Sequence, residues 1–325
     1  MEYSANENRY EKMPYNYAGK SGLKLPAIQL GMWYNFGRHD NFENCRAMMR
    51  TAFDNGITLF DLANNYCEST AEFVVGEILK SDFGAYRDQI LVTSKAGYQD
   101  MPGPYGEWGS KKSVIASLDR SLRKMQLDYF DIFYSHRFDP NTPLEETIHA
   151  LCDAVKQGKM LYLGVSNYSG KDAQRAYEIA KSRNVPLIVN QVRYNIFDRG
   201  IEQTGAQNTD DLSLVCFSPL QQGLLTNKYL KDIPTDSRTA KQLNPHMTDT
   251  EVEKFLPKVK ALNELAQARE QSLSQMALQW VLSRKSVGSA LIGASKPSQI
   301  IECANAASFA PLSDAELKKI DEIAL

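Results

Sequence analysis

The stretch ITLFDLA, residues 57–63, shows the pattern that decides the fold: a short apolar run that ends in polar or small residues. Six further stretches have the same form: ILVTSK at 90–95, DIFYSH at 131–136, LYLGVSN at 161–167, LIVNQ at 187–191, LVCFSP at 214–219 and ALIGAS at 290–295. Nearly continuous apolar runs of this length are typical of parallel strands that are buried on both faces. The polar residues at their ends predict a functional carboxyl edge of the sheet.

Segments with helical periodicity separate these strands. Clear examples are ENCRAMMRTAFDNG at 43–56, SVIASLDRSLRKMQ at 113–126, PLEETIHALCDAVKQG at 143–158 and KDAQRAYEIAKSRN at 171–184. The alternation predicts βαβ units with right-handed crossovers. We therefore predict an α/β fold, a single (β/α)8 barrel over residues 1–325 with extra helices at the C-terminal end. An open doubly wound sheet is the alternative, but its first turn would normally carry G-x-G-x-x-G, which this sequence lacks.

Three regions depart from the alternation. YNYAGKSGLKLPAIQLG at 15–31 contains a Ser-Gly turn and predicts a β-hairpin before the first barrel strand, preceded by an extension at 1–14. The long polar stretch at 223–250 predicts a cofactor or lid loop. RGIEQTGAQNTDD at 199–211 occupies the place of a sixth helix but is poor in apolar residues, so we expect a short or irregular helix there.

Composition narrows the functional classes. The 325-residue chain has a formal net charge of −2, so no basic field indicates nucleic-acid binding. No apolar run approaches the roughly 20 residues of a membrane span, and the N-terminus lacks the basic-then-apolar pattern of a secretory signal. We therefore expect a cytoplasmic protein without a membrane partner.

Cysteine and histidine spacing argues against metal sites and disulfides. The five cysteines, which include Cys67 directly after Tyr66, are widely spaced and form no C-x-x-C. The four histidines show no H-x-x-x-H spacing, so no metal is expected. Reduced thiols are the simpler interpretation, and a redox role for Cys67 stays open.

In a barrel of this kind, ligands bind at the carboxyl ends of the strands. The polar residues predicted there are Asp61, Lys95, His136, Ser166, Asn167, Gln191 and Ser218, with Tyr66 shortly after Asp61. A free phenol has a pKa near 10, which is high for a general acid. We expect the Lys95 ammonium to lower the pKa of Tyr66, and Asp61 to hold Lys95 in place. This set can move a proton, but it cannot supply a hydride, so the chemistry requires a cofactor.

The ordered motifs resemble the aldo-keto reductase superfamily. They are FDLANNY at 60–66, TSKAGY at 93–98, DIFYSHR at 131–137, LGVSNY at 163–168, NQVRYN at 190–195, FSPLQQGLLTNKY at 217–229, IPTDSR at 233–238 and LIGASKPSQIIE at 291–302. The resemblance is to the branch that contains potassium-channel β-subunits and bacterial L-glyceraldehyde 3-phosphate reductases. GYQDMPGPYGEWGSKK at 97–112 resembles the bacterial reductases in particular.

The resemblance implies a catalytic tetrad of Asp61, Tyr66, Lys95 and His136, and NADPH as cofactor. For the nicotinamide it implies stacking on Phe217 and hydrogen bonds from Ser166, Asn167 and Gln191. For the pyrophosphate it implies Ser218, Leu220, Gly223 and Lys228. For the adenosine end it implies Arg238, Gly293, Ser295, Gln299 and Glu302. Arg238, Ser295 and Gln299 are our candidates for the 2′-phosphate, which would favour NADPH over NADH.

The resemblance also implies reduction of small aldehydes or ketones to alcohols, with glyceraldehyde 3-phosphate and methylglyoxal as candidate substrates. Trp33 and Trp108 are candidate walls of the substrate pocket, and Lys111, Lys112 and Arg137 are candidate cations for a phosphorylated substrate. Cys303 replaces the asparagine usual in the family after the glutamate, which puts one adenine contact in doubt. Relatives form tetramers or larger assemblies, so a homo-oligomer stays open.

Two other functions compete with a reductase. One is a slow, cofactor-sensing binding subunit of the channel β-subunit type. His136 argues against it, because those subunits carry asparagine at this place. The other is an unrelated barrel enzyme that acts on phosphorylated sugars without a nicotinamide cofactor.

Overall fold

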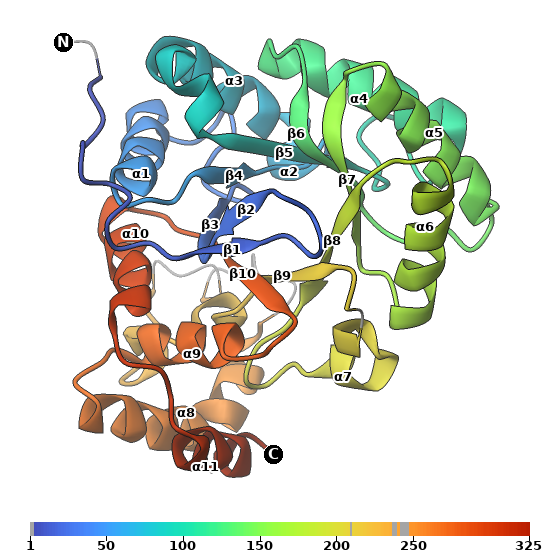
Figure 1. The fold of residues 1–325 in the computed structure, drawn as a ribbon. Coiled ribbons are helices and arrows are strands. Elements are labelled where there is room, and N and C mark those ends of the chain that lie inside the picture. Colours follow the sequence, from blue (N-terminus) through green and yellow to red (C-terminus); the bar gives the residue numbers. More distant parts are fainter. Residues whose placement is uncertain (1–2, 209, 236–238, 241–246) are drawn as a thin grey trace.

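Eight parallel strands close into a barrel in the computed structural model of the chain, which describes residues 3–208, 210–235, 239–240 and 247–325 (Figure 1). The strands are β3 (Ile28–Gly31), β4 (Leu59–Asp61), β5 (Leu91–Ala96), β6 (Phe130–Ser135), β7 (Met160–Ser166), β8 (Leu187–Arg193), β9 (Ser213–Phe217) and β10 (Val287–Ile292). Each strand pairs with the next, and β10 closes the barrel by pairing with both β9 and β3. The predicted (β/α)8 barrel is confirmed.

The first barrel strand lies where the sequence analysis placed only a hairpin. The hairpin consists of β1 (Tyr15–Tyr17) and β2 (Lys24–Pro26), and β3 follows after one residue. The prediction for residues 15–31 is therefore correct for the hairpin but missed the strand. The reason is that β3 directs Gln29 into the barrel beside Leu291, so the strand lacks the continuous apolar run of the others.

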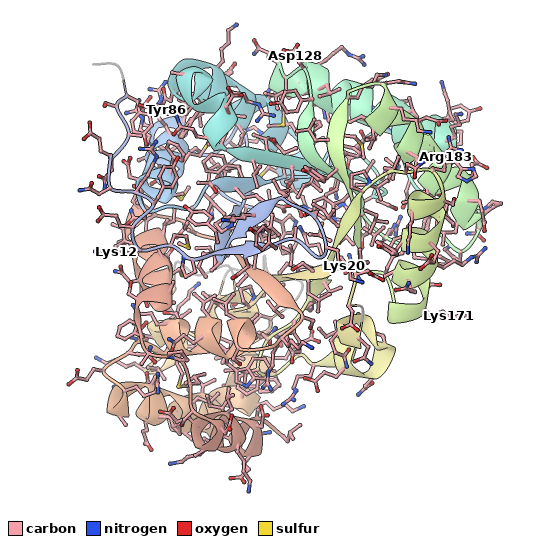
Figure 2. The ribbon with its side chains drawn as sticks, in the orientation of Figure 1. Lys12, Lys20, Tyr86, Asp128, Lys171 and Arg183 are labelled. Atoms are coloured by element: carbon pink, nitrogen blue, oxygen red, sulfur yellow. The ribbon has the colours of Figure 1, made fainter. Side chains whose placement is uncertain are left out.

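The β1–β2 hairpin covers the amino-terminal end of the barrel. Figure 1 shows it in front of the barrel strands. Ala18 and Leu25 are fully buried in the same apolar cluster as Leu59, an inward-facing residue at the start of its strand. Lys20, labelled in Figure 2, lies at the tip of the hairpin. Its ammonium forms an ion pair with Asp211, just before β9, at 2.5 Å. The opposite, carboxyl end of the barrel is the end at which polar residues gather.

Helices surround the strands and bury their outer faces in one large apolar core. The helices that follow the strands are α1 (Phe42–Asp54), α3 (Ala71–Asp82), α4 (Lys111–Met125), α5 (Leu144–Lys156), α6 (Gly170–Ser182), α7 (Gly200–Thr204), α9 (Leu273–Leu282) and α10 (Pro297–Ala304). Two more, α8 (Asp249–Ala268) and α11 (Asp314–Ala324), lie next to one another at one side (Figure 1). Within the described residues, no helix has the length and apolar character needed to cross a membrane.

The sixth helix is short, as its composition predicts. α7 has five residues and ends at Gly205, whose positive φ of 69° suits glycine at a helix C-terminus. Arg199 compensates for the lost packing by donating to Asp321 on α11 at 2.9 Å. Trp280 also donates to Asp321, at 3.0 Å, so this carboxylate links α7, α9 and α11.

Inside the barrel, the ring of Tyr134 forms a floor below the polar carboxyl end. The ring is fully buried, and the Lys95 ammonium lies 5.6 Å from its centroid. Gly164 on the neighbouring strand leaves room for this ring: a Cβ atom there would lie 2.5 Å from two ring carbons. Such pairing of a large residue with a small one is how a close-packed interior is filled.

Candidate active site

A buried ion pair forms the centre of the site. Asp61 ends β4 and Lys95 lies near the end of β5, and both side chains are fully inaccessible to solvent. Lys95 Nζ donates to Asp61 Oδ2 at 2.5 Å and to the Leu62 carbonyl at 2.6 Å, and it lies 3.1 Å from Tyr66 Oη. Asp61 Oδ1 accepts from Thr93 Oγ1 at 2.7 Å and from Gln191 Nε2 at 2.9 Å. Each carboxylate oxygen is therefore satisfied, so the charge is compensated without water.

The chain turns sharply after Tyr66, which begins the short segment α2 (Tyr66–Ser69). Cys67, Glu68 and Ser69 have φ values of 48°, 55° and 63°, a left-handed turn made without glycine. This conformation costs about 1–2 kcal/mol per residue, so neighbours must hold it. Ser69 Oγ donates to the Asp100 carbonyl at 3.3 Å, and Lys124 Nζ donates to the Ser69 carbonyl at the same distance. These contacts fix the backbone that presents the Tyr66 hydroxyl to Lys95.

His136 completes the cluster from the end of β6. Its ring centroid lies 5.9 Å from that of Tyr66 and 4.6 Å from that of Tyr98, with both pairs edge to face. Burial, then Lys95 and Arg137, lower the pKa of His136 well below 6.5. The imidazole is therefore neutral at pH 7 and carries one N–H. Its Nδ1 is buried and has no hydrogen-bond partner among the described residues.

The direction of the Tyr66 pKa corrects the sequence-based expectation. Burial raises the pKa of the phenol well above 10, and the negative charge of Asp61 adds to the increase. Burial likewise lowers the pKa of Lys95, although Asp61 opposes that shift. The expected lowering of the Tyr66 pKa is wrong because burial of the phenol, together with the Asp61 charge, outweighs the attraction of the Lys95 ammonium. Tyr66 is therefore protonated throughout the physiological range.

The residues expected at the nicotinamide lie beside this cluster. Ser166 Oγ donates to the Gln191 carbonyl at 2.9 Å, and Asn167, with a φ of 58°, donates from Nδ2 to the His136 carbonyl at 3.1 Å. Gln191 touches Asp61 directly, as described above. Phe217 ends β9, next to β8, and its register partner is Arg193. Hydrogen bonds thus connect the three polar residues to Asp61 and His136, and Phe217 lies on the neighbouring strand.

The residues expected at the pyrophosphate and adenosine lie in the segments after β9 and β10. Ser218 and Gly223 have positive φ values of 53° and 93° in the turn that also holds Leu220, and Lys228 follows in a short 3₁₀ helix. A Cβ atom on Gly293 would meet nothing within 4 Å, so the backbone there borders open space that a bound group can approach. The cofactor role of these residues stays a prediction that this open backbone permits.

The last turn before α10 and α10 itself hold the remaining adenosine candidates. Gln299 Oε1 accepts from the Ser295 amide at 2.8 Å, and the Glu302 carboxylate accepts from the Ser274 hydroxyl. Arg238 lies outside the described residues, as do residues 236–237 and 241–246 of the predicted lid loop. The structure therefore brings Ser295 and Gln299 together and leaves the third candidate for the 2′-phosphate undescribed.

The two candidate tryptophans lie on loops that flank the cluster. The carbonyl of Trp33 accepts from Cys67 Sγ at 3.3 Å, which connects the loop after β3 to the turn after Tyr66. Trp108, with a φ of 66° and a side chain 37% exposed, lies in the loop between β5 and α4. Their role as walls of a substrate pocket stays a prediction.

The cysteine thiols and the possible metal ligands are the remaining chemical groups of interest. All five cysteines are free, and burial raises the pKa of Cys67 to about 11, so its thiol is protonated at neutral pH. Among the residues that the structure describes, no group of three or more histidine, cysteine or acidic side chains could hold a metal ion. Asp131, which the sequence places in the same strand as His136, accepts from the Val92 amide at 2.8 Å and pairs with Arg87.

Comparison with known proteins shows the family of this chain. Residues 27–325 match the model of the aldo/keto reductase family. The chain belongs to this family. This aldo/keto reductase is 47% identical to the L-glyceraldehyde 3-phosphate reductase of Escherichia coli K12, over 99% of the chain and 95% of the relative. It is 33% identical to a protein of Oryza sativa subsp. japonica named "Probable voltage-gated potassium channel subunit beta", over 96% and 95%.

A solved structure agrees with this assignment. The crystal structure of the thermostable aldo-keto reductase Tm1743 in complex with the inhibitor epalrestat matches with a TM-score of 0.76 at 26% identity. The match covers 96% of this chain and all of that one. The protein is therefore an oxidoreductase of the aldo/keto reductase family with the barrel described above.

Three features of this aldo/keto reductase's site were not foreseen from its sequence. Thr93 binds Asp61, and the signal was present, since Thr93 precedes Lys95 by two residues and so faces the same side of the strand. Tyr98 packs on His136, and the Arg137 guanidinium is stacked between Tyr98 and Trp108. No sequence signal shows that stacking, because it depends on how the loop after β5 folds back.

Proposed function

We propose that this enzyme reduces small aldehydes and ketones to alcohols, with Tyr66 as the general acid. The supporting observation is the position of Lys95 Nζ, which lies within hydrogen-bond distance of both Tyr66 Oη and Asp61 Oδ2 in a fully buried site. NADPH, when bound, supplies the hydride. The protein's own residues bind the carbonyl compound, keep water out and deliver the proton.

The raised pKa of Tyr66 defines what Lys95 must do. A phenol that is protonated at neutral pH is ready to donate, but burial makes the resulting phenolate costly. The ammonium at 3.1 Å stabilises that phenolate as the proton moves to the carbonyl oxygen. The bonds from Lys95 to Asp61 and to the Leu62 carbonyl keep the ammonium in place, so no reorganisation is needed during the reaction.

His136 orients the substrate. Because its low pKa keeps the imidazole neutral, one ring N–H can donate to the carbonyl oxygen without adding a second cation beside Lys95. A carbonyl oxygen that receives hydrogen bonds from both Tyr66 and His136 is polarised towards hydride attack. General acid catalysis of this kind contributes roughly 10²–10⁴-fold to a rate.

Support for NADPH comes from the open edge after β9 and β10. Phe217 would stack on the nicotinamide, with Ser166, Asn167 and Gln191 as its hydrogen-bonding partners. The turn after β9 would hold the pyrophosphate through Ser218, Leu220, Gly223 and Lys228. Gly293, Ser295, Gln299, Glu302 and Arg238 would hold the adenosine end. We assign the 2′-phosphate to Ser295, Gln299 and Arg238, and predict a preference for NADPH over NADH.

Replacement of Tyr66 by phenylalanine tests the mechanism. We expect Tyr66→Phe to lose at least about 10²-fold in kcat with methylglyoxal, because the general acid is removed, while NADPH binding by fluorescence titration is retained. Tyr162→Phe is the matched control, since Tyr162 is a barrel tyrosine at the amino-terminal end and far along β7 from Ser166. Turnover by Tyr66→Phe at the parental rate would exclude Tyr66 as the proton donor.

The second candidate is a cofactor-sensing subunit, favoured by the likeness to the rice potassium-channel β-subunit. It predicts very slow turnover and tightly retained NADP. The neutral histidine at position 136 favours the reductase, because its ring N–H, beside Tyr66, can donate a hydrogen bond to a substrate carbonyl oxygen. Steady-state turnover of the wild-type protein with a panel of aldehydes separates the two.

A further inference from the structure

Arg137, the residue after His136, is held in an aromatic clamp. Its guanidinium carbon lies 3.5 Å from the centroid of the Trp108 ring and 4.2 Å from that of Tyr98. Its Nε donates to the Gly97 carbonyl at 3.1 Å. Stacking against two rings fixes the plane of a guanidinium, which leaves its edge as the part that can bind an anion. We call Tyr98, Trp108 and Arg137 the arginine clamp.

The arginine clamp lies beside the reacting atoms. The Tyr98 ring contacts both the Arg137 guanidinium, at 4.2 Å, and the His136 imidazole, at 4.6 Å. The two groups therefore lie no further apart than the sum of these distances. In a three-carbon aldehyde with a terminal phosphate, the carbonyl carbon and the phosphorus are separated by roughly 5 Å of covalent chain. With a hydrogen bond of about 3 Å at each end, one such molecule spans His136 and Arg137.

An exposed carboxylate now occupies the anion-binding edge of Arg137. Glu107, in the same loop as Trp108, forms an ion pair with the guanidinium. The Glu107 side chain is 35% exposed and that of Arg137 is 21% exposed, so solvent and solutes reach this pair. A partly exposed ion pair contributes little to stability, so breaking it costs little. A phosphate group carries up to two negative charges and binds a guanidinium through two parallel hydrogen bonds, so it can displace Glu107.

Lys111, another of the candidate cations, is less suited to the role. Lys111 is 63% exposed and its ammonium faces Asp153 on α5 at 3.6 Å. It also begins α4, and no ring contact connects it to His136 among the described residues. The geometry thus separates Arg137 from Lys111, which the sequence alone could not do.

We propose that the arginine clamp binds the phosphate of a short phosphorylated aldehyde, with Glu107 giving way to the incoming anion. This proposal rests on the proposed reductase function and names the substrate class for that same site. Arg137 is a specificity-determining residue: it holds the far end of the substrate while Tyr66 and His136 act on the carbonyl group.

The test compares glyceraldehyde 3-phosphate with glyceraldehyde, which has the same carbon chain without the phosphate. The measured quantity is the ratio of kcat/KM for the two substrates, with NADPH saturating. We expect Arg137→Met to lower this ratio at least tenfold, chiefly through KM for the phosphorylated substrate. Arg137→Lys keeps the charge but loses the planar fork, so its ratio should fall in between. Lys260→Met removes an exposed cation on α8 that has no part in the proposed site, and it should change the ratio less than threefold.

Two further measurements test the proposal even if the Arg137 variants do not fold. Glu107→Gln removes the competing anion, so it should lower KM for glyceraldehyde 3-phosphate and raise the ratio. Inorganic phosphate should inhibit glyceraldehyde reduction competitively in the wild type, and more strongly in Glu107→Gln.

The proposal fails if the wild type does not prefer the phosphorylated substrate, or if Arg137→Met and Arg137→Lys lose equally on both substrates. It also fails if Glu107→Gln leaves the ratio unchanged. These outcomes differ from failure of the proposed function. In that case glyceraldehyde itself would not be reduced by the wild type, or Tyr66→Phe would reduce it at the parental rate.

Discussion

Replacing Lys95 by methionine tests whether the site is organised around one buried ion pair. Lys95 and Asp61 are both fully buried, and the lysine donates to Asp61 Oδ2 and to the Leu62 carbonyl and contacts Tyr66 Oη. Methionine has a similar length and fills most of the same volume. The substitution therefore removes the charge and the donors while keeping the packing.

The expected loss in the free energy of unfolding follows from what remains. Asp61 Oδ1 keeps Thr93 and Gln191 as donors, but Oδ2 loses its partner and the carboxylate becomes an uncompensated buried charge. Breaking a buried pair in this way costs about 3–5 kcal/mol. In Lys95→Met/Asp61→Asn the charge is gone, and the asparagine oxygen can still accept both bonds at the Oδ1 position. The asparagine Nδ2 group and the Leu62 carbonyl then lack the Lys95 partner, at roughly 1–3 kcal/mol each, and the cost at Leu62 is common to both variants.

The assay is urea unfolding at pH 7, followed by circular dichroism and by tryptophan fluorescence so that coincident transitions justify a single free energy. We expect the single variant to be less stable than the double variant, with Asp61→Asn restoring at least about 1 kcal/mol. Lys112→Met, an exposed lysine on α4, is the control and should stay within about 0.5 kcal/mol of the wild type.

Either of two results would refute this reasoning. If Lys95→Met lost less than about 1 kcal/mol, the pair would not be the buried, water-free one described. If adding Asp61→Asn lowered stability further, the lost carboxylate charge would not be the source of the penalty. Both results would also weaken the argument that Lys95 stabilises the Tyr66 phenolate.

Three further predictions concern other parts of the barrel. Burial lowers the pKa of His136, so below pH 6.5 the unfolded chain binds a proton at this residue that the native protein does not. The free energy of unfolding therefore decreases as the pH is lowered. Between pH 7 and 5.5 the wild type should lose about 1 kcal/mol more than His136→Asn in urea unfolding. Gly164→Ala places a methyl group 2.5 Å from two carbons of the buried Tyr134 ring, so it should cost about 1–3 kcal/mol, visible as a lower Tm; an unchanged Tm would contradict the packing. Because its pKa is about 11, Cys67 should resist iodoacetamide at pH 7.5 in a mass-spectrometric assay, whereas rapid labelling with loss of activity would restore a redox role.

The barrel was predictable from the sequence because its strands repeat one pattern. The apolar runs that end in Asp61, Lys95 and His136 correspond to β4, β5 and β6, and parallel strands bring such ends to one edge. The first strand was hidden because Gln29 interrupts it. A buried polar residue breaks the apolar run on which the prediction depends.

The sequence predicts which catalytic groups meet at the barrel end, but not the direction in which the pKa of Tyr66 shifts. The sequence shows that a phenol and an ammonium share one barrel end, and attraction between them predicts a lowered pKa for Tyr66. Burial reverses that direction, and burial depends on all the residues that enclose the site. The arginine clamp is unpredictable for a similar reason, since it needs the loop carrying Trp108 to return over Arg137. Local sequence shows which residue types are present. How far they are desolvated, and which loops pack over them, depends on the complete tertiary structure.

The hairpin at the amino-terminal end has a consequence for the order of events during turnover. With Ala18 and Leu25 closing that end, the proposed cofactor and aldehyde would both enter from the carboxyl end. The residues expected at the nicotinamide reach down to Asp61 through Gln191, so the nicotinamide would sit deeper than the aldehyde. We therefore expect last-in, first-out traffic: cofactor arrives before aldehyde, and alcohol departs before oxidised cofactor. The hairpin that closes one end of the barrel would thus determine the order in which ligands bind at the other end.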